Sequence, residues 1–157
     1  MDLQELASLA IFKSFTTQQL KVLQPFMEFC SFPANMVIFQ QGDRADYFYI
    51  LTLGEIALYF KPYDGPSLTI TKLTPVDVFG WSAALGHSSY SSTAIANRDV
   101  KLIRLQAENL QKLCNIDQAT TALFLDRLVG VISGKLHDSH QEILTLFSNG
   151  LNFNNDC

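Results

Sequence analysis

Hydroxyl side chains gather around one glycine in the middle of the chain, where they could bind a small ligand. Segment 78–85 reads Val-Phe-Gly-Trp-Ser-Ala-Ala-Leu, and segment 90–94 reads Tyr-Ser-Ser-Thr-Ala. An apolar strand that ends at a Phe-Gly pair predicts a tight turn, a short helix and a returning strand of small residues. Free N–H groups and a partial positive charge at a helix N-terminus suit phosphate. The sequence therefore predicts a pocket between the two segments.

The residues expected to line this pocket are aromatic, small or hydroxylic. They are Phe79, Gly80, Trp81, Ser82, Ala83, Ser91, Ser92 and Thr93. Two interpretations of Trp81 compete. As a wall of an open pocket beside the serine hydroxyls, it would suit a neutral or weakly anionic planar ligand. As a core residue it would fill the pocket, which is the commoner role of a lone Trp in an apolar protein.

Little in the chain could catalyse a reaction or hold a metal. His137 and His140 are three residues apart on a predicted helix, a spacing that can bind metal, but a solvated helix face is the simpler interpretation. No histidine lies in a predicted strand, as the iron site of a barrel-shaped oxygenase would require. We therefore predict a protein that is not an enzyme, with no catalytic residue, no metal and no resident cofactor.

Short apolar runs separated by turn residues fill the middle of the chain. They predict strands. The runs are 26–32, 36–39, 47–51, 56–60, 68–73, 93–96 and 100–105. Helical patterns flank them, with a capping box at Thr16 and Gln19 and a helix N-cap at Asp117. The predicted fold class is mainly β with flanking helices (α+β), a sandwich, barrel or jelly roll.

The last predicted helix carries an apolar stripe at spacings of three and four. Its members are Leu125, Leu128, Ile132 and Leu136. Val129 and Val131 widen the stripe beyond what packing on one roll needs. We therefore predict that the protein forms a homodimer through this helix, as twin subunits commonly do.

Composition excludes several classes of partner. The 157 residues carry a net charge of −4, and 11 scattered Lys and Arg residues give no basic patch for nucleic acid. No window is apolar enough to span a membrane, and the acidic N-terminus is not a signal peptide. We expect a cytoplasmic protein that contacts neither DNA nor membrane, with a protein partner that the sequence does not name.

The order of these pieces resembles the cyclic-nucleotide-binding domain family, as in Crp/Fnr-like effector domains. The resemblance rests on Gly42-Asp43 before an apolar strand, on Gly54 before the next, and on Asp77-Val78-Phe79-Gly80. It implies a double-stranded β-helix or jelly roll with a long C-terminal helix, and a role in signal transduction. Family regulators of transcription append a helix-turn-helix, but this chain ends ten residues after Phe147.

The resemblance also shows what is missing. In the family a Glu follows Phe-Gly and binds the ribose hydroxyl, and an Arg ten positions later holds the cyclic phosphate. Trp81 and Ser91 stand at these positions here. Because a hydrogen bond to a charged group contributes roughly 1.5–3 kcal/mol, losing the Arg should weaken binding by about 10- to 150-fold. The sequence thus predicts a sensor domain with weak or absent cyclic AMP and cyclic GMP binding.

Two alternatives stay open, namely a constitutive dimerisation or interaction module with a filled pocket, and a sensor retuned to another small ligand. In either case we expect a single domain. Its predicted parts are N-terminal helices at 1–28, the roll at 29–105 with the ligand segment at 78–94, C-terminal helices at 106–148 and a flexible tail at 149–157.

Overall fold

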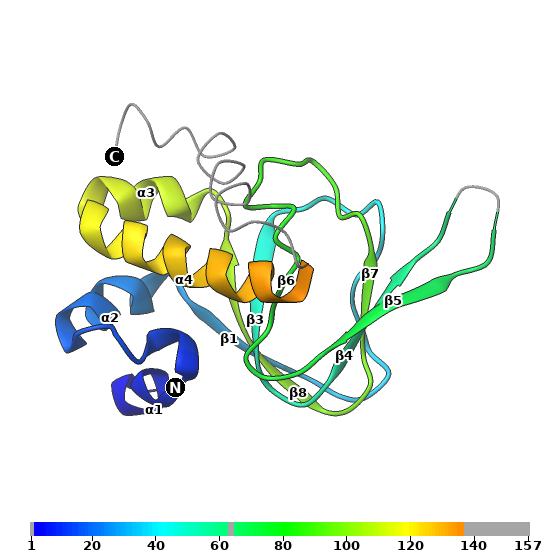
Figure 1. The fold of residues 1–157 in the computed structure, drawn as a ribbon, viewed down its shortest axis with the longest axis horizontal. Helices are drawn as coiled ribbons and strands as arrows, with labels where there is room; N and C mark the ends of the chain where they lie inside the picture. The colour runs from blue at the N-terminus through cyan, green and yellow to red at the C-terminus, as the bar shows by residue number, and fades with distance from the viewer. Residues whose placement is uncertain (1, 63–64, 137–157) are drawn as a thin grey trace.

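The computed structural model describes residues 2–62 and 65–136, with the backbone alone for residue 70 and residues 133–136. Within these ranges eight strands form a roll, and helices gather at one end of it (Figure 1). The strands are β1 (Glu28–Phe32), β2 (Val37–Phe39), β3 (Tyr47–Leu53), β4 (Ile56–Phe60), β5 (Leu68–Leu73), β6 (Val78–Phe79), β7 (Thr93–Ala96) and β8 (Val100–Gln106). The predicted jelly roll with flanking helices is confirmed.

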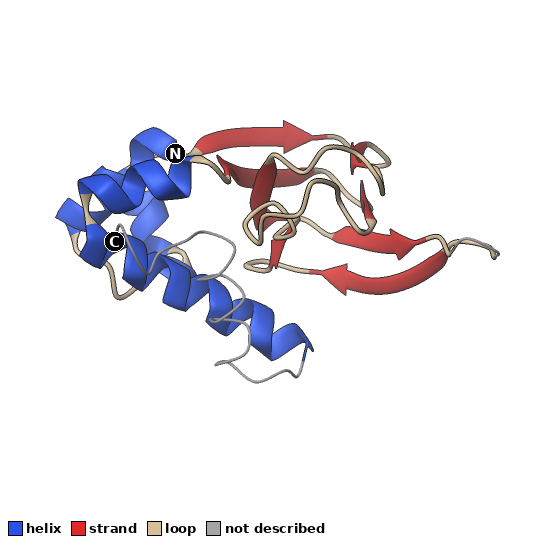
Figure 2. Cartoon of the chain, turned by 90° about the horizontal axis from the view of Figure 1, so that it is seen from above, coloured by secondary structure: helices blue, strands red, loops and turns tan. Residues whose placement is uncertain are grey.

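The roll consists of two four-stranded antiparallel sheets. Their strand orders are β1-β8-β3-β6 and β2-β7-β4-β5. Figure 2 shows them as two layers, with the helices beyond one end. β3 and β8 are paired through Phe48↔Leu105 and Ile50↔Ile103, at the centre of the first sheet. Because this sheet packs between the helices and the second sheet, its central strand β3 is buried on both faces from Phe48 to Leu51.

Alternation along β3 divides the core into two clusters. Phe48 and Ile50 belong to a cluster with the helices, whereas Tyr49 and Leu51 belong to a cluster inside the roll. This is the period of two that a strand imposes, since successive side chains point to opposite faces. We call the first cluster the helix-side core and the second the roll interior.

Side-chain caps begin two of the helices that shape the helix-side core, α2 (Thr17–Leu23) and α4 (Gln118–Leu136). The others are α1 (Leu3–Ser8), η1 (Ala10–Phe12), η2 (Gln24–Phe26) and α3 (Asn109–Ile116). The predicted capping box is present, because Thr16 Oγ1 accepts from the Gln19 N–H at 3.1 Å and Gln19 Oε1 accepts from the Thr16 N–H at 2.9 Å. Asp117 caps α4 by accepting from the Thr120 N–H at 3.0 Å, and this bond lowers the pKa of its carboxyl.

α4 joins the two halves of the molecule. It packs on α2 and α3 and reaches β6 of the roll (Figure 1). Phe124 and Leu128 are fully buried in the helix-side core. None of the described helices has the length and apolarity that a membrane span needs. The predicted tail 149–157, and the C-terminal helices beyond residue 136, lie outside the described residues.

Candidate functional site

Gly80 turns the chain sharply after β6. Its φ of +69° lies in the left-handed region, which favours glycine because it has no Cβ. A Cβ built there would lie 3.0 Å from Tyr49 Cδ2 and 3.2 Å from Phe39 Cε2. The tight turn that the sequence predicted is therefore enforced by both the backbone and two aromatic rings.

The helix expected after Gly80 is absent, and that prediction was wrong. Residues 81–86 form a run of turns. Three of their N–H groups donate to carbonyls three residues earlier, from Ala83 to Gly80, from Leu85 to Ser82 and from Gly86 to Ala83, at 3.2–3.3 Å. Gly86, with φ +81°, ends the run. Glycines at positive φ bound the run on both sides, and no helix forms between them, so the site has no helix dipole for a phosphate.

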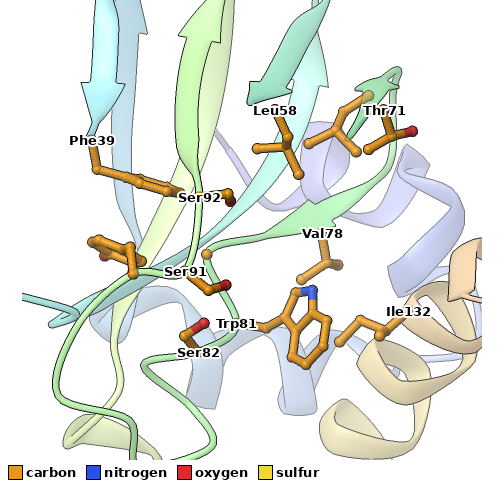
Figure 3. Close-up of a pocket in the computed structure, with 12 residues that line it drawn as sticks. Phe39, Leu58, Thr71, Val78, Trp81, Ser82, Ser91, Ser92 and Ile132 are labelled. Atoms are coloured by element: carbon orange, nitrogen blue, oxygen red, sulfur yellow. The ribbon is translucent and has the colours of Figure 1, made fainter. Parts of the chain in front are cut away.

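A cavity of about 380 Å³ opens beside these turns, within the range of small-molecule pockets. The residues that line it come from the roll, the turns and α4 (Figure 3). They are Phe39, Leu58, Thr71, Leu73, Val78, Gly80, Trp81, Ser82, Tyr90, Ser91, Ser92 and Ile132. None of these lining residues is charged, so their hydroxyls and one indole N–H are the polar side-chain groups available to a ligand.

Five of the eight residues predicted for the pocket line this cavity. They are Gly80, Trp81, Ser82, Ser91 and Ser92. Three others lie elsewhere. Phe79 is buried in the roll interior, where it stacks on Tyr49. Ala83 is buried within the turns, and Thr93 Oγ1 accepts from the Gln41 N–H at 2.9 Å.

Trp81 forms one wall of the cavity. Its indole lies between Val78 and Ile132 of α4 (Figure 3), and it packs on the helix-side core. The ring is only partly buried. It therefore combines the two roles that the sequence presented as alternatives, because it packs against α4 and still leaves the cavity open.

Tyr90 was missed by the sequence analysis, although it lines the cavity. Its ring stacks on Phe39 with centroids 3.8 Å apart, and its hydroxyl donates to the Tyr47 carbonyl at 2.5 Å. Its N–H donates to the Asp43 carbonyl at 2.9 Å, and its own carbonyl accepts from the Gly42 N–H at 2.9 Å. Burial raises the pKa of the Tyr90 hydroxyl. The chain is thus fixed just before Ser91 and Ser92, and the cavity is preformed.

The described residues contain no group of three or more His, Cys, Asp or Glu side chains that could hold a metal. His87 is exposed at the end of the turns. His137 and His140, the pair with helical spacing, lie outside the described residues.

The stripe predicted to face a twin subunit is covered by the chain itself. Leu125, Leu128 and Ile132 are 5%, 0% and 2% exposed, and the side chain of Leu136 is not described. These apolar side chains pack within one molecule, as part of the helix-side core. Ala122 and Gly130 lie on the exposed side of α4, and a Cβ built on Gly130 meets nothing within 4 Å.

Comparisons with known proteins agree with one another. A model of the cyclic nucleotide-binding domain matches residues 29–117. The cyclic AMP receptor protein of Thermus thermophilus is 22% identical over 133 residues, which are 85% of this chain and 60% of that protein. The cAMP-dependent protein kinase regulatory subunit of Aspergillus fumigatus is 30% identical over 82 residues, which are 52% of this chain and 19% of the subunit.

A solved structure repeats the same fold. The cyclic nucleotide-binding domain from Methylobacillus flagellatus superposes with a TM-score of 0.75 at 19% identity, covering 91% of this chain and 80% of that one. Such a likeness concerns the fold alone. The chain thus matches over most of its own length, but spans less than two thirds of the two relatives named above.

Proposed function

Because the chain belongs to the cyclic nucleotide-binding domain family, we propose that it is a non-enzymatic regulatory domain that binds cyclic AMP and cyclic GMP weakly or not at all. The observation that carries this proposal is the lining of the cavity, in which no charged side chain occurs among the described residues. A cyclic nucleotide carries a phosphate charge, and an ion enters a partly dry cavity at a high cost unless it is paired.

The two substituted positions support the same conclusion. Trp81 and Ser91, which stand where the family resemblance places a Glu and an Arg, both line the cavity. An indole accepts no hydrogen bond from a ribose hydroxyl, and a serine hydroxyl is a weaker phosphate ligand than a guanidinium. Together these losses are expected to move a micromolar ligand towards millimolar affinity.

Isothermal calorimetry with cyclic AMP and cyclic GMP tests the proposal. The wild-type chain should give no saturable binding below about 100 μM, since two charged contacts worth roughly 1.5–3 kcal/mol each are missing. The double variant Trp81→Glu/Ser91→Arg should bind at least about tenfold more tightly. Trp81→Gln/Ser91→Gln has similar polarity without the charges, and it should show no gain.

The wild-type measurement decides the matter even if the double variant folds poorly. Micromolar binding of either nucleotide by the wild-type chain would overturn the proposal. If a well-folded Glu/Arg variant gains nothing over its Gln/Gln control, the cavity itself does not fit a nucleotide, and the two substitutions are not the reason for weak binding.

The open cavity favours one of the two alternatives over the other. A constitutive interaction module would be expected to fill its pocket with side chains, whereas here Trp81 leaves a cavity of about 380 Å³ open. A cavity of this size forgoes contacts between side chains that a filled core would gain. A sensor retuned to another small ligand is therefore the second candidate function.

We also propose that the domain acts in the cytoplasm as a homodimer through α4. Since the predicted stripe is buried, the contact would use the exposed side of that helix, where the small side chain of Ala122 permits close approach. Sedimentation velocity tests this. Ala122→Glu should produce monomers, whereas Thr17→Glu, which adds the same charge on α2, should not. A monomeric wild-type chain would contradict the dimer.

A further inference from the structure

The cavity beside Trp81 has the chemistry of a site for an uncharged ring. Two aromatic surfaces line it, the indole of Trp81 and the stacked pair of Phe39 and Tyr90. In Figure 3 the labelled rings of Trp81 and Phe39 lie on different sides of Ser91. Aromatic rings prefer offset or edge contacts with other rings, so a flat molecule gains contact with either surface.

Aliphatic side chains complete most of the remaining lining. Leu58, Leu73 and Val78 come from three strands of the roll, and Ile132 comes from α4. A mainly apolar wall favours a ligand that has little polar surface, because such a ligand loses few contacts with water when it binds. The hydroxyls of Ser82, Ser91 and Ser92 can both donate and accept, so a single polar group on the ligand finds partners there.

The floor of the cavity is fixed before any ligand arrives. Tyr90 is held by its hydroxyl bond to the Tyr47 carbonyl and by main-chain bonds with Asp43 and Gly42. A preformed site loses little conformational freedom on binding, which favours affinity for a rigid ligand. Both the shape and the rigidity of the site point to a compact, planar occupant.

We propose that this cavity binds an uncharged, planar aromatic molecule that carries one hydroxyl, amine or amide group, and that it excludes anions of the same size. The inference rests on the regulatory role proposed above, because it names the ligand class of that site. Trp81 connects the site to α4. Its indole lines the cavity and also lies beside Ile132 of that helix (Figure 3).

A matched pair of fluorescent probes tests the proposal. N-phenyl-1-naphthylamine is neutral, and 8-anilinonaphthalene-1-sulfonate has the same rings with one added sulfonate. Trp81 is the single tryptophan of the chain, so energy transfer from it to a probe reports binding near the cavity. The neutral probe should bind at least about tenfold more tightly than the sulfonate, because an unpaired buried charge is costly.

Two substitutions on β5 show whether the probe is in the cavity. Thr71→Phe fills the space from the wall opposite the turns, and it should weaken binding of the neutral probe at least about tenfold. Thr69→Phe adds the same ring at an exposed position of the same strand, which does not line the cavity. It should leave the affinity for the probe unchanged.

Each result has a definite meaning. No binding of the neutral probe, equal affinity for both probes, or binding that Thr71→Phe leaves intact would overturn the assigned ligand class. These failures are distinguishable from failure of the proposed function, which is judged by calorimetry with cyclic nucleotides. A chain that ignores both nucleotides and both probes would keep the proposed function and lose this inference.

Discussion

The two sides of the sheet β1-β8-β3-β6 differ in how completely they are packed. On the helix side, Phe48, Ile50 and Ile103 have no exposed surface, and the ring of Phe48 lies against that of Phe124. On the roll side, Tyr49 stacks on Phe79 and Phe39, and Phe39 borders a cavity of about 380 Å³.

The difference follows from what covers each face. Helices can adjust their position until side chains interdigitate, so the helix-side core closes. The second sheet is fixed by its own ladder, and the chain between β6 and β7 runs as turns instead of a helix. Serines and glycines in those turns leave the space unfilled. The helix side of the first sheet thus closes into a core, whereas the cavity lies between the second sheet, the turns and α4.

The sharpest test of this comparison truncates one side chain on each face. Phe124→Ala should reduce the free energy of unfolding by about 3–5 kcal/mol, because it opens a hole among fully buried rings. Leu58→Ala should cost about 1 kcal/mol, since Leu58 is half-buried and already borders a cavity. Urea denaturation measures both, and equal losses would contradict the contrast.

A pair of glycines gives a smaller effect with opposite signs. Gly80→Ala should destabilise by roughly 1–2 kcal/mol, because a Cβ at positive φ would lie 3.0 Å from Tyr49 Cδ2. Gly130→Ala on exposed α4 should stabilise by about 1 kcal/mol, because its new Cβ meets nothing. The melting temperature should fall for the first variant and rise for the second. Two shifts of the same sign would be inconsistent with these geometries.

Alkaline pH should weaken the roll interior through its buried tyrosines. Burial raises the pKa of both tyrosine hydroxyls. For Tyr49, the electrostatic interaction with the neighbouring Tyr90 raises it further. A folded pKa above the unfolded value gives stability that is present below about pH 10 and lost as pH rises through the folded pKa. The free energy of unfolding should therefore fall with rising pH in this range. It should fall less steeply in Tyr90→Phe, and an identical slope would refute this origin.

Local patterns in the sequence were sufficient to predict most of the fold. The β4 and β5 runs begin and end at the predicted residues 56–60 and 68–73, and Asp117 caps α4 as expected. These features depend on side-chain alternation and on capping chemistry, which are local. The run after Gly80 resembled a helix in composition, but the second glycine, Gly86, ends it in turns.

The residues of the site could be predicted only in part, because residue spacing in the sequence does not show which segments meet across the roll. Ser91 was placed by its distance from Trp81, yet the buried residue that fixes this loop is Tyr90. Only the partner across the roll, Phe39, reveals that role. The stripe on α4 was correctly read as apolar, but a single sequence does not say whether Leu128 is covered by its own chain or by a twin. In the structure its own chain covers it.

Methyl NMR provides the most direct test that the roll side is an open, uncharged site and the helix side is closed. The neutral naphthylamine probe should shift the methyl signals of Leu58 and Leu73, which line the cavity from the roll, and leave Ile50 and Ile103 of the helix-side core in place. Cyclic AMP at the same micromolar concentration should shift none of them. Shifts of Leu58 and Leu73 by cyclic AMP, or equal shifts of all four residues by the probe, would contradict this account.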